Sequence, residues 1–437
     1  MTPPLDIASP SCPDPGERSV QERPVLRERG QREVFCGLTS IIWLHRKLQD
    51  AFFLIVGSRT CAHLMQSAAG VMIFAEPRFG TAIIDDKDLA GLTDPFDELR
   101  EIIDSIVARR PALKTVFLVG SCPSEVIKLD LSKIADRLNS DLAGQPRVLS
   151  YSGSGIETTF TDGEDACLNA IVSNIGSIQQ TRATKKSLLV VGALADIVED
   201  QFARHFGDLG IEHVSFIPSN ATAEKAEFGP NTSFVLAQPF LRETARTLTD
   251  KGGKFIPAPF PFGLEGTRAW FKAIADEFDI PHKRVNDVLA SAETRASKAL
   301  ANARSEFEGT RVFFFPDSQL EVPLARFLSR ELGAEIIEIG TPYLHTEIMK
   351  PELDLLGTNI LISEGQDVDA QLRRCRSAKP DLTVCGMGLG NPLEAEGLTT
   401  KWSIELVFSP IHGFDQALDL ANLFLKPLRR QKRLALS

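Results

Sequence analysis

One unit recurs along the chain from about residue 50 onward. A short run of β-branched or aromatic residues is followed by a break at Gly, Ser or Pro, and then by a stretch with helical periodicity. Continuous apolar runs of this length are typical of strands buried on both faces, so we expect parallel strands at 52–56, 71–75, 115–119, 187–191, 214–217, 234–236, 311–315, 335–339, 359–362 and 381–385. Amphipathic stretches at 266–278, 320–332 and 414–428 supply covering helices. The alternation predicts an α/β fold with parallel sheets.

Length and two shifts in composition predict three Rossmann-like domains. A chain of 437 residues holds about three domains at roughly 150 residues each. Polar, charged stretches at 179–186 and 291–309 each precede a new strand, so we divide the chain into domains 31–182, 183–307 and 308–437, the last with a C-terminal helix. Residues 1–30 hold six prolines and nine charged residues without periodicity, and we expect them to form a mobile arm outside the fold.

The overall charge excludes several classes of partner. The net charge of −10 leaves no broad basic footprint for nucleic acid. No apolar run approaches the roughly 18 residues of a membrane span, and the amino end lacks the apolar core of a signal peptide, so we expect a cytoplasmic protein without a membrane span. Seven widely spread cysteines do not make a disulfide framework. In a reducing compartment these thiols are buried, reactive or metal-binding.

Three of the cysteines fall in the first domain in similar settings. Cys61 and Cys122 each follow a predicted strand and open a predicted helix, and Cys36 stands before Gly37. The carboxyl ends of parallel strands share one edge of a sheet, so thiols placed there can converge although they lie 25 and 61 residues apart in the sequence. The partial positive charge of a helix N-terminus favours a thiolate over a thiol. The three cysteines are therefore candidate metal ligands.

Each cysteine taken singly is also compatible with a structural role. Unpaired cysteine is among the most commonly buried residues, so packing is an alternative to ligation at each position. No C-x-x-C pair is present, which argues against a zinc ribbon, a thioredoxin-type redox pair or a bacterial-ferredoxin cluster. No G-x-x-x-x-G-K-[ST] sequence is present either, so we expect this chain not to bind ATP through a P-loop. The remaining thiols Cys12, Cys167, Cys375 and Cys385 read as incidental.

Several motifs together carry a resemblance to a known family. The spacing of Cys36, Cys61 and Cys122, the run SGSGIETTF at 152–160, and the C-terminal segments WSIEL at 402–406 and IHGF at 411–414 closely resemble the N subunits of light-independent protochlorophyllide reductase. These subunits are related to the α subunit of the nitrogenase molybdenum-iron protein. The resemblance covers about residues 31–430, so it implies a nitrogenase component 1-like arrangement of the three domains.

The resemblance also implies an activity, a cofactor and partners. It implies an ATP-dependent oxidoreductase that reduces the C17=C18 double bond in ring D of protochlorophyllide and gives chlorophyllide a. A [4Fe-4S] cluster would be held by Cys36, Cys61 and Cys122, with the fourth ligand from a partner B subunit in an N2B2 heterotetramer. A transient L-protein dimer would use ATP and Mg and deliver the electrons. The resemblance gives no proton donor in this chain, so the catalytic residues are left unassigned.

A comparison with nitrogenase indicates where the pigment would bind. In nitrogenase α subunits, the histidine that holds the molybdenum cofactor lies nine residues before the histidine of the shared His-Gly motif. Ser403 occupies that position here, counted back from His412, so we expect no such cofactor and a vacated space for a planar tetrapyrrole. Phe35, Trp402 and Phe408 are candidate apolar walls of that space, and each is also compatible with a plain core position.

Three other functions remain open at this point. One is the related subunit of chlorophyllide a reductase, whose cluster chemistry would look alike. Another is a non-catalytic scaffold on which a nitrogenase-type metallocofactor is assembled, against which Ser403 and the match around Trp402 argue. The last is a three-domain α/β binding protein with incidental thiols.

Overall fold

The fold is given by a computed structural model of the chain. It describes residues 25–72, 78–84, 87, 94–142, 145–156, 158–175, 186–219, 228–357 and 359–434. The described residues form three α/β units, each built on a sheet of parallel strands. The expected fold class is therefore confirmed. No described helix combines the length and the apolar character needed to cross a lipid bilayer.

The first unit is a four-stranded sheet in the order β3-β2-β4-β5. Its two central strands are β2 (Ala51–Gly57) and β4 (Thr115–Gly120), and every residue of both is buried because helices cover both faces of the sheet. The outer strands are β3 (Phe79–Ile83) and β5 (Arg147–Ser152). The helices are η1 (Gly37–Ser40, a 3-10 turn), α1 (Ile41–Lys47), α2 (Arg59–Met72), α4 (Pro95–Arg109), α5 (Cys122–Val126), α6 (Leu131–Asp141) and α7 (Asp162–Ser173).

One strand of this unit does not lie where the sequence predicted it. The apolar run 71–75 was expected to be a strand, but α2 continues through Met72, and 73–75 lie outside the described residues. The strand that pairs with β2 on its outer side is β3, whose Phe79 aligns with Phe53. A short apolar run fits the end of a buried helix as well as it fits a strand, so periodicity alone could not separate the two.

The second unit repeats the same plan. Its sheet has the order β7-β6-β8-β9, and its strands β6 (Ser187–Val191) and β7 (Val214–Ile217) have the bounds expected from the sequence. The other strands are β8 (Thr232–Leu236) and β9 (Lys254–Phe255). The helices are α8 (Asp196–Leu209), α9 (Arg242–Asp250), α10 (Gly263–Glu277) and α11 (His282–Phe307).

The third unit is the largest sheet, in the order β1-β12-β11-β10-β13-β14. Its strands are β1 (Val25–Arg29), β10 (Arg311–Phe314), β11 (Glu335–Thr341), β12 (Leu361–Gln366), β13 (Leu382–Cys385) and β14 (Thr400–Trp402). The helices are α12 (Glu321–Arg326), which continues into the π-helical turn η3 (Phe327–Glu331), α13 (Thr346–Leu355), α14 (Val368–Ala378), α15 (Met387–Ala395), α16 (Ser403–Phe408) and α17 (Ala417–Leu434). The predicted helix at 320–332 thus has an α-helical and a π-helical half.

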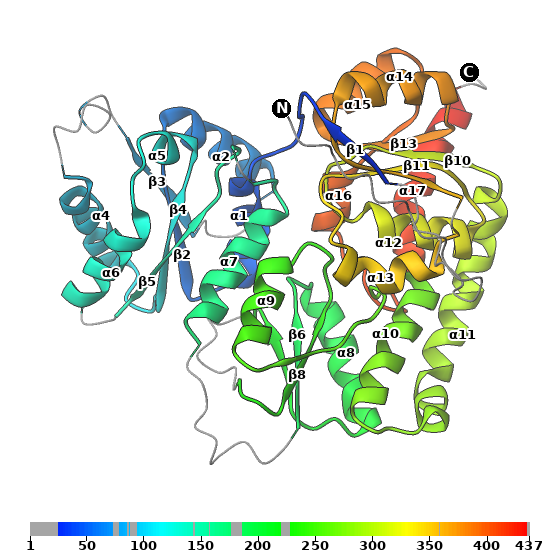
Figure 1. The fold of residues 1–437 in the computed structure, drawn as a ribbon, viewed down its shortest axis with the longest axis horizontal. Coiled ribbons are helices and arrows are strands. Elements are labelled where there is room, and N and C mark those ends of the chain that lie inside the picture. The colour runs from blue at the N-terminus through cyan, green and yellow to red at the C-terminus, as the bar shows by residue number, and fades with distance from the viewer. Residues whose placement is uncertain are drawn as a thin grey trace, which may run out of the picture.

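The expected arm at 1–30 is wrong for its last residues. Residues 25–29 form β1, which pairs in parallel with β12 at the edge of the third sheet, far from the first domain that follows it in sequence (Figure 1). Glu28 secures the strand by an ion pair with Arg374, whose guanidinium also binds Glu338. The partner strand is more than 330 residues away, so no local pattern could reveal the pairing. Residues 1–24 lie outside the described part of the chain.

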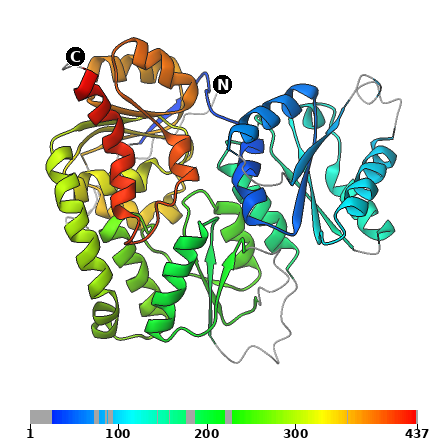
Figure 2. The ribbon, with the colours of Figure 1, turned by 180° about the vertical axis from the view of Figure 1, so that it is seen from behind.

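The three units pack on one another along long helices. α17 lies beside α11, so the carboxyl end of the chain covers the helix that leads out of the second unit (Figure 2). One apolar core runs continuously through all three units, and a smaller core fills the other face of the first sheet. The sheets fall within the three predicted ranges apart from β1, while the boundaries near 182 and 308 remain predictions.

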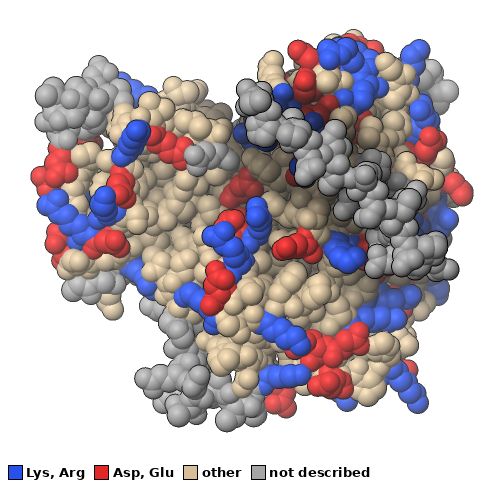
Figure 3. Space-filling model, in the orientation of Figure 1, with Lys and Arg blue, Asp and Glu red and all other residues tan. Residues whose placement is uncertain are grey.

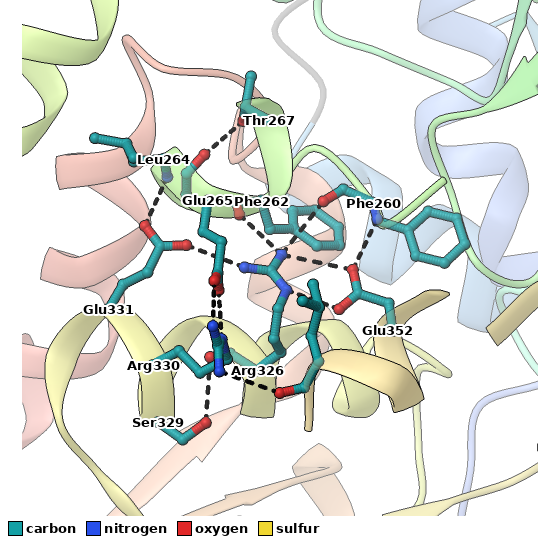
Figure 4. Close-up of polar contacts among 12 residues, drawn as sticks. Phe260, Phe262, Leu264, Glu265, Thr267, Arg326, Ser329, Arg330, Glu331 and Glu352 are labelled. Atoms are coloured by element: carbon teal, nitrogen blue, oxygen red, sulfur yellow. Dashed lines mark hydrogen bonds and ion pairs between the residues drawn. The ribbon is translucent and has the colours of Figure 1, made fainter. Parts of the chain in front are cut away.

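A fully buried arginine joins the second and third units. Arg326 donates from Nε to Glu352 over 2.7 Å and from Nη1 to Glu331 over 3.0 Å (Figure 4). Its Nη2 reaches the carbonyl oxygen of Phe262 at 3.0 Å, in the turn that leads into α10. Burial of a charge is costly unless every donor is paired. The pairing therefore fixes α10 against α12 and α13.

Candidate metal centre

Two of the three candidate cysteines stand at adjacent strand ends. β2 and β4 pair in register, with Val56 opposite Gly120, and the chain then turns into α2 and α5. Cys61 lies in the first turn of α2, and Cys122 is the first residue of α5. Ser121 joins the two turns by donating from Oγ to the carbonyl oxygen of Val56 over 2.6 Å.

Gly57 allows these two turns to approach each other. A Cβ at this position would lie 2.6 Å from Oγ of Ser121 and 3.4 Å from Cβ of Cys61. The missing side chain therefore leaves the space in which Ser121 and Cys61 sit side by side.

Cys36 reaches the same edge of the sheet from another segment. It precedes the 3-10 turn η1 and forms an isolated antiparallel bridge with Thr159. The N–H of Leu38 also donates to the carbonyl oxygen of Gly153 over 3.0 Å. Both contacts hold Cys36 against the loop that follows β5, the strand next to β4.

Gly155 of that loop lies between two of the cysteines. Its backbone N–H donates to Sγ of Cys122 over 3.3 Å. A Cβ on Gly155 would lie 3.0 Å from Cβ of Cys36 and 3.8 Å from Sγ of Cys122. The neighbouring Ser154 hydroxyl also lies 3.8 Å from the same sulfur. The absence of a side chain at Gly155 therefore lets this loop lie close to both Cys36 and Cys122.

The three thiols are close enough to interact electrostatically. The pKa of Cys36 is raised chiefly by burial, and the charges of Cys122 and Cys61 raise it further. All three cysteines are free and partly exposed. Sequence reasoning thus placed the three residues at one edge of the first sheet, as the structure shows, and it missed the part that Gly155 plays among them.

The three cysteines do not form a site for a single metal ion. In the described part of the chain, no group of three or more His, Cys, Asp or Glu side chains is close enough to hold one metal ion. A cubane cluster spreads its ligands over four iron atoms, so its thiolates stand further apart than those around one ion. Three neighbouring, partly exposed thiols fit three of the four ligand positions of such a cluster, with one ligand still to be supplied.

The three candidate aromatic residues occupy different positions. Phe35 is half-buried in the extended segment directly before Cys36. Trp402 ends β14 and is 37% exposed, with its indole nitrogen against Gly390. Phe408 ends α16 and is half-buried. Trp402 and Phe408 therefore flank one short helix, while Phe35 belongs to the cysteine segment.

Phe408 faces the first unit across the boundary between the units. Its ring meets that of Trp43 in α1 edge to face, with the centroids 5.5 Å apart. Trp43 is held by Glu164, whose Oε2 accepts from its indole N–H at 2.6 Å. Glu164 is completely buried, and burial raises the pKa of its carboxyl to about 7. Sequence reasoning missed this pair, because a lone Trp carries no signal of a partner in another domain.

Ser403 is buried at the start of α16. Its Oγ is hydrogen-bonded to Oδ2 of Asp317, and the carbonyl oxygen of Cys385 lies 3.1 Å from the same hydroxyl. The side chain of Ser403, the position singled out by the sequence comparison, is thus turned into the protein and engaged there.

Acidic and basic side chains are interspersed on the face of the molecule drawn in Figure 3.

Comparisons with known proteins place the chain in a family. Residues 36–429 match the family model described as nitrogenase component 1 type oxidoreductase. The light-independent protochlorophyllide reductase subunit N of Bradyrhizobium sp. (strain ORS 278) is 63% identical over 411 residues, which cover 94% of this chain and 96% of that protein. The corresponding subunit of Rubrivivax gelatinosus is 59% identical over 430 residues, covering 98% and 99%.

A solved structure titled "Nitrogenase Cp1 at pH 6.5" has the same fold. It superposes with a TM-score of 0.72 at 14% identity and covers 94% of this chain and 96% of its own. The match extends over nearly the whole length of each protein, so the chain belongs to the light-independent protochlorophyllide reductase subunit N family, within the nitrogenase component 1 type oxidoreductases.

Proposed function

We propose that this chain is the N subunit of an ATP-dependent, light-independent protochlorophyllide reductase. The reaction adds two electrons and two protons across the C17=C18 bond of ring D, so that each carbon gains a hydrogen and chlorophyllide a is formed. Relatives at about 60% identity over nearly their full length bear this name, which supports the proposal. The observation that carries it in this chain is the proximity of Cys36, Cys61 and Cys122 at one edge of the first sheet, where Gly155 lies close to Cys36 and Cys122.

Cys36, Cys61 and Cys122 hold a [4Fe-4S] cluster in this proposal. When bound, the cluster supplies one-electron transfer at a potential that its ligands and their hydrogen bonds adjust. The N–H of Gly155 donates to the Cys122 sulfur and so stabilises negative charge on that ligand. Burial of Cys36 works in the opposite direction, since it disfavours charge on the sulfur.

The fourth ligand comes from the partner B subunit of an N2B2 heterotetramer. The three thiols are partly exposed, which leaves the centre accessible to a carboxylate from another chain. This sequence has no P-loop of its own, so ATP and Mg are used by another component, a transient L-protein dimer. That dimer delivers the electrons one at a time. We place the assembly in the cytoplasm.

The pigment binds against apolar side chains near the boundary between the first and third units. Phe35, Trp402 and Phe408 supply aromatic surface for the faces of the macrocycle. The edge-to-face contact of Phe408 with Trp43 keeps its ring in place, and Trp43 is itself anchored on buried Glu164. Aromatic packing excludes water from the reduced bond, which restricts proton delivery to positioned donors. We assign no proton donor within this chain.

The test is a reconstitution of the complex with each pigment. The chain is co-purified with its partner subunit without oxygen and supplied with the reductase component, ATP and a reductant. We expect protochlorophyllide to be converted to chlorophyllide a, seen as a new red absorbance band, and chlorophyllide a to be left unchanged. Turnover of chlorophyllide a alone would favour the related chlorophyllide reductase. Transfer of iron to an apoprotein without turnover of either pigment would favour a cofactor-assembly scaffold.

A further inference from the structure

Two buried carboxyls lie close together after β10, and they have unequal sets of donors. The Oε1 atom of Glu321 accepts from the backbone N–H groups of Asp317, Ser318 and Gln319, at 3.0, 2.6 and 3.1 Å, and from the Ser318 hydroxyl at 3.1 Å. Among the described residues, Ser403 is the only hydrogen-bond partner of the Asp317 side chain. Oδ1 of Asp317 and Oε2 of Glu321 have no hydrogen-bond partner there. Both residues are 1% exposed. The donors therefore favour a negative charge on Glu321 rather than on Asp317.

The Ser403 hydroxyl has one hydrogen and two acceptors within reach. Oδ2 of Asp317 and the carbonyl oxygen of Cys385, which lies 3.1 Å away, both face its Oγ. If Asp317 is ionised, the single hydrogen serves only one of the two. If Asp317 carries a proton on Oδ2, it donates to Ser403 Oγ, and the Ser403 hydrogen is then free for the Cys385 carbonyl. Only the protonated form completes the chain of hydrogen bonds.

The charge environment agrees with this count of hydrogens. Glu321 is the like-charged group that acts on Asp317, and two like charges cannot both be ionised cheaply in a buried site. Burial first, and then this repulsion, raises the pKa of Asp317 to about 7. Burial raises the pKa of Glu321 as well, but the backbone N–H groups that it accepts from lower it again.

The chain of hydrogen bonds joins three neighbouring parts of the third sheet. Asp317 follows β10, Cys385 ends β13, and Ser403 directly follows β14 and opens α16. These strands are adjacent in the order β10-β13-β14. α16 carries Trp402 at its N-cap and Phe408 at its last residue. Whatever fixes Ser403 therefore fixes both aromatic residues.

We propose that Asp317 is a neutral carboxylic acid that donates to Ser403, and that this Asp317–Ser403–Cys385 chain positions α16 so that Trp402 and Phe408 meet the pigment. Asp317 and Ser403 are positioning residues, because neither is placed in contact with the pigment. The protonation of Asp317 stands on the hydrogen-bond count alone, whereas the positioning of the aromatic walls rests on the proposed function.

Infrared spectroscopy of the co-purified complex tests the protonation state. We expect the difference spectrum between wild type and Asp317→Asn to show the loss of one carbonyl band of a protonated carboxylic acid, shifted in ²H₂O. Loss of a carboxylate band pair in its place would overturn the proposal. This readout does not depend on turnover or on pigment binding, so it stands even if the proposed function fails.

Pigment binding tests the positioning role. An Asn amide can donate to Ser403 as a protonated Asp does, so Asp317→Asn should bind protochlorophyllide within about threefold of wild type, while Asp317→Ala and Ser403→Ala weaken binding about tenfold or more. The iron content should be unchanged in all three variants. The positioning role would be overturned if Asp317→Asn and Asp317→Ala weakened pigment binding equally, or if Ser403→Ala bound the pigment as wild type does.

Ser363→Ala is the matched control for these variants. Ser363 is also fully buried in the third sheet and also donates to a carboxylate, that of Glu338 at 2.7 Å, but it lies on β12 away from α16. We expect it to bind the pigment as wild type does. If Ser363→Ala weakened pigment binding as much as Ser403→Ala does, loss of any buried hydrogen bond would be enough to weaken it. That result would refute the positioning role. Failure of wild type itself to bind any pigment would refute the proposed function instead.

Discussion

The backbone N–H of Gly155 points at the sulfur of Cys122, 3.3 Å away, and its Cα faces Cys36. One residue without a side chain thus lies close to two of the three cysteines at the edge of the first sheet. The relationship explains why the loop after β5 matters to a centre whose ligands all lie elsewhere. It also identifies Gly155 as the position at which even the methyl group of an alanine should disturb the metal centre most.

Gly155→Ala should impair cluster binding without unfolding the chain. The added Cβ would lie 3.0 Å from Cβ of Cys36, so Cys36 or the loop must shift by a few tenths of an ångström. We expect the iron content of the anaerobically purified complex to fall at least twofold and reductase activity about tenfold. Gly207→Ala in α8 is the control, since nothing lies within 4 Å of its added Cβ. Full iron content in Gly155→Ala would contradict the requirement for a residue without a side chain at this position.

Serine substitutions should separate ligand thiols from structural ones. Cys36→Ser, Cys61→Ser and Cys122→Ser should each lose most of the broad visible absorbance of the cluster and all measurable activity, because an alcohol is a poor ligand for iron in place of a thiolate. Cys375→Ser is the control. Cys375 is buried beside the Thr383 hydroxyl, at 3.8 Å, which offers a new hydroxyl a hydrogen-bond partner. Retained cluster and activity in any of the first three variants would count against that residue as a ligand.

Alanine at either end of α16 should weaken pigment binding and leave the cluster content unchanged. Trp402→Ala and Phe408→Ala remove aromatic surface from the proposed walls, and loss of such a contact typically costs about 1–3 kcal/mol, or about 5- to 150-fold in Kd. Fluorescence titration with protochlorophyllide measures the affinity, and iron content checks the cluster. Ile197→Ala, at a position 60% exposed in the second unit, should leave both unchanged. Unaltered affinity in both aromatic variants would remove α16 from the pigment site.

Glu331 should make the chain less stable as the pH rises. Burial raises the pKa of its carboxyl to about 7, from an ordinary value of 4.5. Between pH 4.5 and 7 the native state therefore binds more protons at this site than the unfolded state does, so the free energy of unfolding falls as the pH rises through that window. Glu331→Gln should remove this slope.

The comparison of two pH values isolates the effect of Glu331. Urea unfolding gives the free energy of unfolding of both proteins at pH 5 and at pH 8. The value for Glu331→Gln minus the value for wild type should be about 2–3 kcal/mol higher at pH 8 than at pH 5. Glu335→Gln makes the same change of formal charge at an exposed side chain, and its difference from wild type should stay within about 0.5 kcal/mol across the range. A pH-independent difference for Glu331→Gln would show that Glu331 remains ionised beside Arg326.

The sequence predicted the elements that local pattern determines. β6 and β7 have their expected bounds because each is a short, buried apolar run with breaks on both sides. The convergence of Cys61 and Cys122 followed from the rule that parallel strands end at a shared edge, and β2 and β4 are indeed neighbours.

Contacts between distant segments could not be predicted in this way. β1 depends on a partner strand at the other end of the chain, and the contact of Trp43 with Phe408 depends on how two units pack. Arg326 sits within a predicted amphipathic helix, yet it is completely buried, because Glu352 from α13 and Glu331 from η3 pair with it. In each case the partner is chosen by tertiary packing, which leaves no periodic signal.

An anaerobic structure of the co-purified complex tests the central claim most directly. The account predicts electron density for one four-iron cluster, with the sulfurs of Cys36, Cys61 and Cys122 each bonded to a different iron and the fourth iron bonded to an atom of the partner subunit. A cluster that lacks any one of these three sulfurs, or one with all four ligands from this chain, would contradict it.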